Sequence, residues 1–341
     1  MLCKSYLTSL HDHLSCASFL IGTFEIMTQN PSPSPPDPKF VLRGEMEPVS
    51  CIEFMSDHTL YAGTQDGKIH VWDLIKNRRK TSFQAGNSVC IAIKVFQNGI
   101  LSQCKGEGVS LWTFSDNYQL EFQYENPYIG FCKLETDGHE ICSSLFMPAE
   151  NSEVKVMDLN SYKIINTFCC TSGKVGEIMV MKCIRLDNTV LLLVCYESGD
   201  IYLWNVLRGT PISKFKISNV PMAVDFDEEK RKGIFGTESD SAIIFKIGVG
   251  FEFGTEMSVT LTNPGVSAVT IRSDKKIFVL GCWDGNLRVY SWKTGRILAV
   301  LSEHKDTINA LSYSSKIIPL WGSILLAAAS KDKSISLWSF L

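Results

Sequence analysis

Short runs of alternating apolar residues, separated by polar turns, recur along most of the chain. Val49 to Phe54, Thr59 to Gly63 and Thr81 to Phe83 are three such runs. Alternation with a period of two, rich in β-branched and aliphatic side chains, predicts β-strands. Apolar residues occupy both faces of many runs, which indicates sheets covered on both sides. The pattern therefore predicts an all-β protein.

A turn followed by a strand that ends in a large side chain recurs seven times. We call this last side chain the anchor, and the anchors are Trp72, Trp112, Met157, Trp204, Phe245, Tyr290 and Trp338. Successive anchors lie 40, 45, 47, 41, 45 and 48 residues apart. A period of this length with four strand-like runs per unit is typical of a propeller blade. We predict a seven-bladed β-propeller over residues 39–341.

Three repeats carry an aspartate six residues before the anchor. Asp66 precedes Trp72, and Asp284 and Asp332 have the same spacing to Tyr290 and Trp338. This spacing resembles the WD repeat, so the resemblance implies a WD40-type propeller. It also implies that these residues, with the anchors Trp112 and Trp204, have structural roles.

The seventh repeat resembles the WD pattern most closely. His304, Ser330, Asp332 and Trp338 occupy the positions at which WD repeats share a buried hydrogen-bond network. An imidazole, a hydroxyl, a carboxylate and an indole N–H can satisfy one another there. The third and fifth repeats have Met157 and Phe245 in place of tryptophan, so we expect those blades to hold by packing alone.

The last repeat leaves too few residues after Trp338 for the outermost strand of its blade. Phe40, Val41 and Leu42 resemble such a strand and precede the first blade. We predict that they pair with the C-terminal blade and close the ring, which removes two open sheet edges.

Residues 1–38 show no repeat character. The Pro/Ser-rich tract from Asn30 to Pro38 cannot form a regular ladder of hydrogen bonds, so we expect a disordered, solvated leader. A linker is one interpretation of this tract and a polyproline ligand is another. Met27, just before it, is a candidate for an alternative translation start.

Composition narrows the classes of partner and compartment. The net charge is −3 with both signs interspersed, which gives no reason to expect nucleic acid or an anionic membrane. The apolar stretch Ile317 to Ala329 is interrupted and shorter than the ~20 residues of a spanning helix. The twelve cysteines form no CxxC pair, which favours a reducing, cytoplasmic or nuclear location. Cys169 and Cys170 are adjacent, and the sequence leaves their role open.

No motif indicates catalysis, a cofactor or a metal. His304, Asp332 and Ser330 have the residue types of a catalytic triad, but repeat positions between strands deny a substrate access. The run Gly248 to Gly254 has the wrong glycine spacing for a dinucleotide site and is expected to be a turn. A propeller enzyme would cluster carboxylates at the mouth of its channel, and the turn sequences do not identify such a cluster. We therefore expect a protein that is not an enzyme.

Three stretches resemble the guanine nucleotide-binding protein subunit beta-like protein 1 family, which is related to the yeast ASTRA-associated propeller. They are Pro35 to Gly44, Leu261 to Asp284 and Lys331 to Ser339. The resemblance covers about residues 28–341. It implies a monomeric propeller within larger assemblies, where it supports maturation and stability of phosphatidylinositol-3-kinase-related kinases with ASTRA and TELO–TTI co-chaperone proteins.

A signalling Gβ subunit is a poor interpretation, because residues 1–38 offer prolines in place of the heptads that hold a γ partner. The alternative function is a substrate adaptor or a reader of modified tails that uses the central mouth. The partner-binding face stays open at this stage, although Trp283 and Trp321 are candidate interface anchors.

Overall fold

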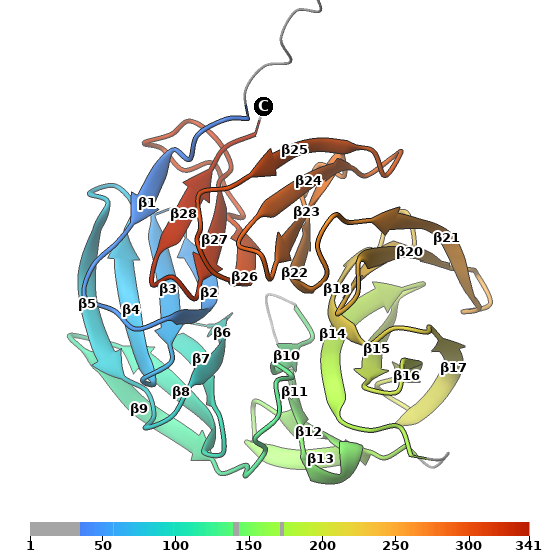
Figure 1. The fold of residues 1–341 in the computed structure, drawn as a ribbon. Coiled ribbons are helices and arrows are strands. Elements are labelled where there is room, and N and C mark those ends of the chain that lie inside the picture. The colour runs from blue at the N-terminus through green and yellow to red at the C-terminus, as the bar shows by residue number, and fades with distance from the viewer. Residues whose placement is uncertain (1–34, 57, 98, 139–142, 171–173, 341) are drawn as a thin grey trace, which may run out of the picture. The chain divides into compact units, whose positions relative to one another are not determined.

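The computed structural model describes residues 35–56, 58–97, 99–138, 143–170 and 174–340. Within them the strands β1 to β28 form seven four-stranded antiparallel sheets, with one short 3-10 turn at Glu150–Ser152. The sheets surround a central opening as the blades of a propeller (Figure 1). The prediction of an all-β, seven-bladed propeller is confirmed.

Each blade has its first strand nearest the ring centre. Blades 1 to 3 contain β2 Val49–Ser56, β3 Thr59–Thr64, β4 Lys68–Asp73, β5 Arg78–Gln84, β6 Cys90–Phe96, β7 Gly99–Cys104, β8 Gly108–Phe114, β9 Tyr118–Tyr124, β10 Glu135–Thr136, β11 Ser144–Pro148, β12 Val154–Asp158 and β13 Lys163–Phe168. Blades 4 and 5 contain β14 Ile178–Leu186, β15 Thr189–Tyr196, β16 Asp200–Asn205, β17 Thr210–Lys216, β18 Pro221–Asp227, β19 Lys232–Thr237, β20 Ser241–Ile247 and β21 Phe253–Thr260. Blades 6 and 7 contain β22 Val266–Ile271, β23 Ile277–Cys282, β24 Leu287–Ser291, β25 Ile297–Leu301, β26 Ile308–Tyr313, β27 Leu326–Ser330, β28 Ile335–Trp338 and β1 Phe40–Leu42.

The turn before each anchor strand explains the small and polar residues of the repeat. Gly67, Gly199 and Gly285 adopt φ angles of 76°, 79° and 80° in these turns, in the left-handed region that favours glycine. Lys333 takes the same region in blade 7, with φ 68°. Of the run from Gly248 to Gly254, residues 248–252 connect β20 to β21, as expected for a turn, and the last two residues begin β21.

The closing strand comes from the other end of the chain. Phe40 pairs with Leu337, Val41 with Ser336 and Leu42 with Ile335, in antiparallel register with β28. Lys39 N–H also donates to the Leu337 carbonyl at 2.7 Å. The predicted ring closure is confirmed, and Figure 1 shows β1 beside β28.

The core lies between neighbouring blades. The second strands β3, β7, β19, β23 and β27 are buried at almost every position, whereas the outer strand β5 is mostly exposed. One cluster joins the closing strand to blade 1, because Leu42 packs with Trp72 and Leu74. Burial on both sheet faces accounts for the apolar residues on both sides of these strands.

The predicted leader falls mostly outside the described residues, as does the alternative start at Met27. Only residues 35–38 of that leader are described, and they lead into β1 without regular structure.

Candidate functional site

A chain of side-chain hydrogen bonds lies inside blade 7. His304 Nδ1 is 2.9 Å from Asp332 Oδ2, and its Nε2 is 2.7 Å from Ser336 Oγ. Trp338 Nε1 donates to the same Ser336 hydroxyl at 2.6 Å. Ser334 donates to Asp332 Oδ1 at 2.6 Å. Burial alone would raise the pKa of Asp332, but the hydrogen bond from Ser334 and the nearby His304 lower it below its usual value.

The hydroxyl in this chain is not the one we expected. Ser336 links the imidazole to the indole, whereas Ser330 donates to the Asp306 carbonyl at 2.8 Å and accepts from Asp332 N–H. The reason is position: Ser336 lies inside β28, two residues before Trp338, whereas Ser330 is the last residue of β27, next to the turn. Ser330 therefore stabilises the turn before β28. Ser336 links His304 to Trp338, and Ser334 contacts both Asp332 and His304.

The other aspartates before an anchor use cations in place of histidine. Arg288 holds Asp284 with two hydrogen bonds, at 3.0 and 2.7 Å, and Asn263 donates to it at 2.8 Å. Burial would raise the pKa of Asp284, but these donors bring it well below the usual range. Asp66 pairs with Lys68 at 2.8 Å. Tyr290, the anchor of blade 6, is buried.

The remaining anchors have fewer polar partners. Trp112 Nε1 donates to Ser102 at 2.9 Å, whereas Trp72 and Trp204 Nε1 are buried without a partner among the described residues. Met157 is fully buried among apolar side chains, and Phe245 stacks on Phe235 at 4.1 Å between ring centres.

Blade 1 also buries a histidine, but on the anchor strand itself. His70 is 2% exposed, Arg79 lies 3.4 Å from its Nδ1, and its Nε2 has no partner among the described residues. Burial and then the guanidinium of Arg79 lower the pKa of His70 to about 4. This imidazole is therefore neutral near pH 7.

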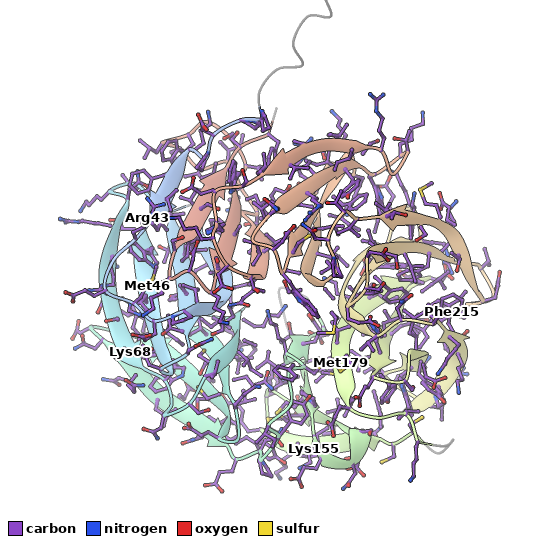
Figure 2. All side chains as sticks on the ribbon, viewed as in Figure 1. Arg43, Met46, Lys68, Lys155, Met179 and Phe215 are labelled. Carbon is purple, nitrogen blue, oxygen red and sulfur yellow. The ribbon has the colours of Figure 1, made fainter. Side chains whose placement is uncertain are left out.

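The candidate binding site is the central channel. A cavity of about 470 Å³ is lined by the innermost strands of all the blades. Figure 2 shows Met179 on β14 near the inner side of the ring and Phe215 on β17 farther out. The cavity reaches Gln65 and Lys105, which lie in turns before anchor strands, so its mouth opens on the face that carries those turns.

A ring of alternating charge crosses the channel at one level. The strand registers place five charged residues of blades 1 to 5 there: Glu53, Lys94, Glu135, Lys182 and Asp225. Two ion pairs form between neighbouring blades, Lys94 with Glu135 at 3.3 Å and Lys182 with Asp225 at 2.9 Å. The first of these pairs raises the pKa of Lys94, and the second raises that of Lys182. Burial raises the pKa of Glu53, which has no ion pair among the described residues.

The level above this ring is made of small or apolar side chains and one cation. In blades 1 to 5 this level holds the residue two positions before the charged one, and in blades 6 and 7 it holds the residue at the equivalent register. These wall residues are Cys51, Ala92, Lys133, Val180, Ala223, Ala268 and Ala310. Lys133, from blade 3, donates to the Asn309 carbonyl of blade 7 at 3.3 Å. Because blades 3 and 7 are not neighbours, this side chain crosses the channel.

The connection between β9 and β10 forms part of the mouth. Ile129 and Phe131 in this connection are 76% and 71% exposed. The ammonium of Lys105 lies 3.8 Å from the centre of the Phe131 ring, a cation–π contact. Met179 of blade 4 and Met222 of blade 5 line the same cavity with flexible thioether side chains.

The other residues singled out in the sequence lie apart from the channel cavity. Trp283 is 42% exposed at the turn before β24, so it reaches a surface, whereas Trp321 packs partly against the cluster of Leu42. Cys169 is exposed and donates to Glu153 at 3.4 Å, and burial raises its thiol pKa. Cys170 is half-buried beside it.

Across the described residues no group of three or more His, Cys, Asp or Glu side chains could hold a metal ion. No helix within the same residues is long and apolar enough to cross a membrane.

The channel charges were missed at the sequence level. Residues of the charged level stand 18 to 22 positions before their anchors in blades 1 to 5, because the hairpins between first and second strands differ in length. The usable signal was a charged residue inside the first strand of each of blades 1 to 5, a costly place for a charge unless it faces a partner or a channel.

Comparison with known proteins agrees with this architecture. The family described as WD domain, G-beta repeat, matches residues 36–73 and 295–339. Guanine nucleotide-binding protein subunit beta-like protein 1 of Mus musculus is 30% identical, over 90% of this chain and 97% of that protein. ASTRA-associated protein 1 of Schizosaccharomyces pombe is 25% identical, over 89% of this chain and 98% of that protein. The protein of that name in Schizosaccharomyces japonicus is 24% identical with the same coverage.

The two ends that match the WD description are the ends that pair in blade 7, and the similarity to the mouse protein runs through all the blades. The chain therefore belongs to the WD-repeat family of guanine nucleotide-binding protein subunit beta-like protein 1.

Proposed function

We propose that this protein is a non-catalytic scaffold that binds other proteins within an ASTRA-type assembly. The observation that carries the proposal is the near full-length similarity to proteins named ASTRA-associated protein 1, over 89% of this chain and 98% of the relatives. A rigid ring with turns of different sequence around one mouth presents several distinct surfaces, which suits a protein that joins partners.

Two of the three carboxylates of the charged level are held in ion pairs, which favours a scaffold over an enzyme. Acid–base catalysis needs a carboxylate within hydrogen-bond reach of a substrate. Glu135 and Asp225 are instead ion-paired with lysines of the neighbouring blades, and Asp225 also accepts from Ile271 N–H at 2.7 Å. This arrangement suits a stiff channel wall.

In its finer form, the proposal is that the scaffold acts in the cytoplasm and nucleus with TELO–TTI co-chaperone proteins. There it would support the maturation and stability of phosphatidylinositol-3-kinase-related kinases. The test is affinity capture of the tagged full chain from its own cells, read by mass spectrometry, together with kinase protein levels after its depletion.

We expect ASTRA-type proteins in the capture, and lower kinase protein at unchanged messenger RNA. Recovery of only ubiquitin-ligase subunits, with kinase levels unchanged, would replace the proposal by the alternative of a substrate adaptor. The cavity at the channel mouth is the observation that favours that alternative.

A further inference from the structure

We infer that the channel mouth binds an acidic side chain of an extended partner segment, with Lys133 as the cation that receives it and Phe131, Met179 and Met222 as its apolar flanks. This inference rests on the proposed function, because it names the chemistry by which the scaffold would hold one partner.

Among the lysines on the first strands and at the wall level, Lys133 has hydrogen-bonding capacity that the described residues do not use. Lys94 and Lys182 each pair with a carboxylate in the level below. Lys133 donates only to the Asn309 carbonyl, and no carboxylate of the described residues lies within ion-pair distance of it. An ammonium has three protons to donate, so two remain for a ligand. The side chain is exposed to the channel, yet the surrounding protein lowers the pKa of its ammonium.

The walls beside Lys133 leave room for a ligand. Ala92, Ala223, Ala268 and Ala310 stand at its level of the channel, where longer side chains would fill the opening. The cavity of about 470 Å³ is in the size range of small-ligand sites, and it is open at the mouth. A single side chain can enter from the face that carries the turns before the anchors.

The rim supplies apolar contact and a second cation. Phe131 is highly exposed, and an exposed aromatic ring beside a cavity is a good anchor for a partner. Met179 and Met222 can adapt their shape to a neighbouring apolar residue. Lys105 lies on the Phe131 ring and has no ion pair among the described residues.

The charge balance selects an anion over a cation. An entering lysine or arginine would meet Lys105 and Lys133 before any carboxylate. Of the three carboxylates below, Glu135 and Asp225 are already paired with lysines. Glu53 lies in the charged level below Lys133, and burial raises its pKa. The ligand is therefore an aspartate or glutamate with an apolar neighbour in the segment.

The experiment pans a random twelve-residue peptide library displayed on phage against the full chain and three variants. Lys133→Glu reverses the charge in the channel, and Lys133→Gln removes it at similar size. Lys331→Glu is the matched control, because Lys331 is exposed in the turn before β28, on the same face and outside the cavity. Melting temperatures of all four proteins confirm that each is folded.

We expect the wild type and Lys331→Glu to enrich peptides with an aspartate or glutamate beside a large apolar residue. The affinity of a selected peptide should fall more than about tenfold with Lys133→Gln, and further with Lys133→Glu. Equal enrichment by all four proteins, or no acidic enrichment by the wild type, would overturn the inference. Binding of phosphoserine peptides but not of their glutamate counterparts would overturn the assignment to a carboxylate.

Affinity capture with the same variants separates this inference from the proposed function. If the wild type and folded Lys133→Glu capture ASTRA-type proteins equally, the result supports the scaffold function and shows that the channel is not its binding site. If acidic peptides are selected in a Lys133-dependent way but no ASTRA-type protein is captured, the result supports the channel site and contradicts the proposed function.

Discussion

Blade 7 and blade 3 have the same four-strand plan but differ in how they follow the repeat. Blade 7 has a six-residue innermost strand, a chain of hydrogen bonds from Asp332 to Trp338, and the closing strand. Blade 3 has an innermost strand of two residues, Glu135–Thr136, and the anchor Met157, a thioether with no proton to donate. Its connection from blade 2 brings Phe131 and Lys133 to the channel.

The difference indicates that some blades contribute mainly to stability and others mainly to binding. Where the repeat is regular, buried polar groups satisfy one another and fix the blade on its neighbours. Where it is irregular, the connection is free to place exposed apolar and cationic side chains at the mouth, which suits binding. Stability is therefore expected to depend most on blade 7 and recognition most on blade 3.

The largest effect is expected at the closing strand. Leu42 is fully buried between blades 7 and 1, so Leu42→Ala should lower the free energy of unfolding by about 3 kcal/mol. Phe40 in the same strand is 37% exposed, and Phe40→Ala should cost less than half as much. Urea unfolding followed by tryptophan fluorescence measures both. Equal losses would mean that the strand pairing is not anchored in the core.

The next effect is expected in the hydrogen-bond chain of blade 7. Ser336→Ala leaves Trp338 Nε1 and His304 Nε2 without their common partner, which should cost about 2 kcal/mol in unfolding free energy. Ser110 occupies the equivalent place in blade 2, where Trp112 donates to Ser102 instead. Ser110→Ala is therefore the control and should cost much less. A loss as large for Ser110 as for Ser336 would refute the special role of blade 7.

A pH-dependent effect is expected in blade 1. This blade keeps the aspartate and the tryptophan anchor of the repeat, but the Trp72 Nε1 has no partner among the described residues. His70 has a pKa of about 4 in the folded protein, below its ordinary value of 6.5. Between those two values the unfolded chain binds a proton that the folded protein does not, so stability falls as the pH falls through this window.

His70→Leu removes that contribution. Its unfolding free energy should decline less than that of the wild type between pH 7 and pH 5, by about 2 kcal/mol. Urea midpoints at pH 7, 6 and 5 measure the difference. Parallel pH profiles of the two proteins would show that His70 does not titrate abnormally.

The smallest effect is expected at the anchor of blade 3. Met157→Leu conserves an apolar side chain of similar volume in a site without hydrogen bonds, so unfolding free energy should change by less than about 1 kcal/mol. Trp338→Phe in blade 7 removes an indole N–H that Ser336 accepts, and should cost more. Comparable costs for the two anchors would erase the contrast between the blades.

The fold was predictable because its signals are local. A polar turn, a short alternating strand and a large anchor fix the blade count, and the missing last strand indicates the closure by Phe40, Val41 and Leu42. Ser330 and Ser336 could not be ranked in the same way. Both are serines near the anchor, and only the folded geometry shows that Ser336 reaches His304 while Ser330 bonds the Asp306 carbonyl.

The candidate site was less predictable because it is assembled from distant repeats. Lys133 lies in a connection with no strand pattern, and its contact with Asn309 spans 176 residues. The paired charges Lys94 and Glu135 lie at different numbers of residues from their anchors, so an alignment of the repeats by their anchors does not place the two at the same position. Such a site becomes visible only when the ring closes.

The central claim is that blade 7 holds the ring while the mouth beside blade 3 binds the partner. The most direct test measures melting temperature and affinity capture of ASTRA-type proteins for Ser336→Ala and Lys133→Glu side by side, at a temperature where both are folded. We predict a lower melting temperature with retained capture for Ser336→Ala, and an unchanged melting temperature with lost capture for Lys133→Glu. Capture that falls in both variants in proportion to their melting temperatures would contradict the claim.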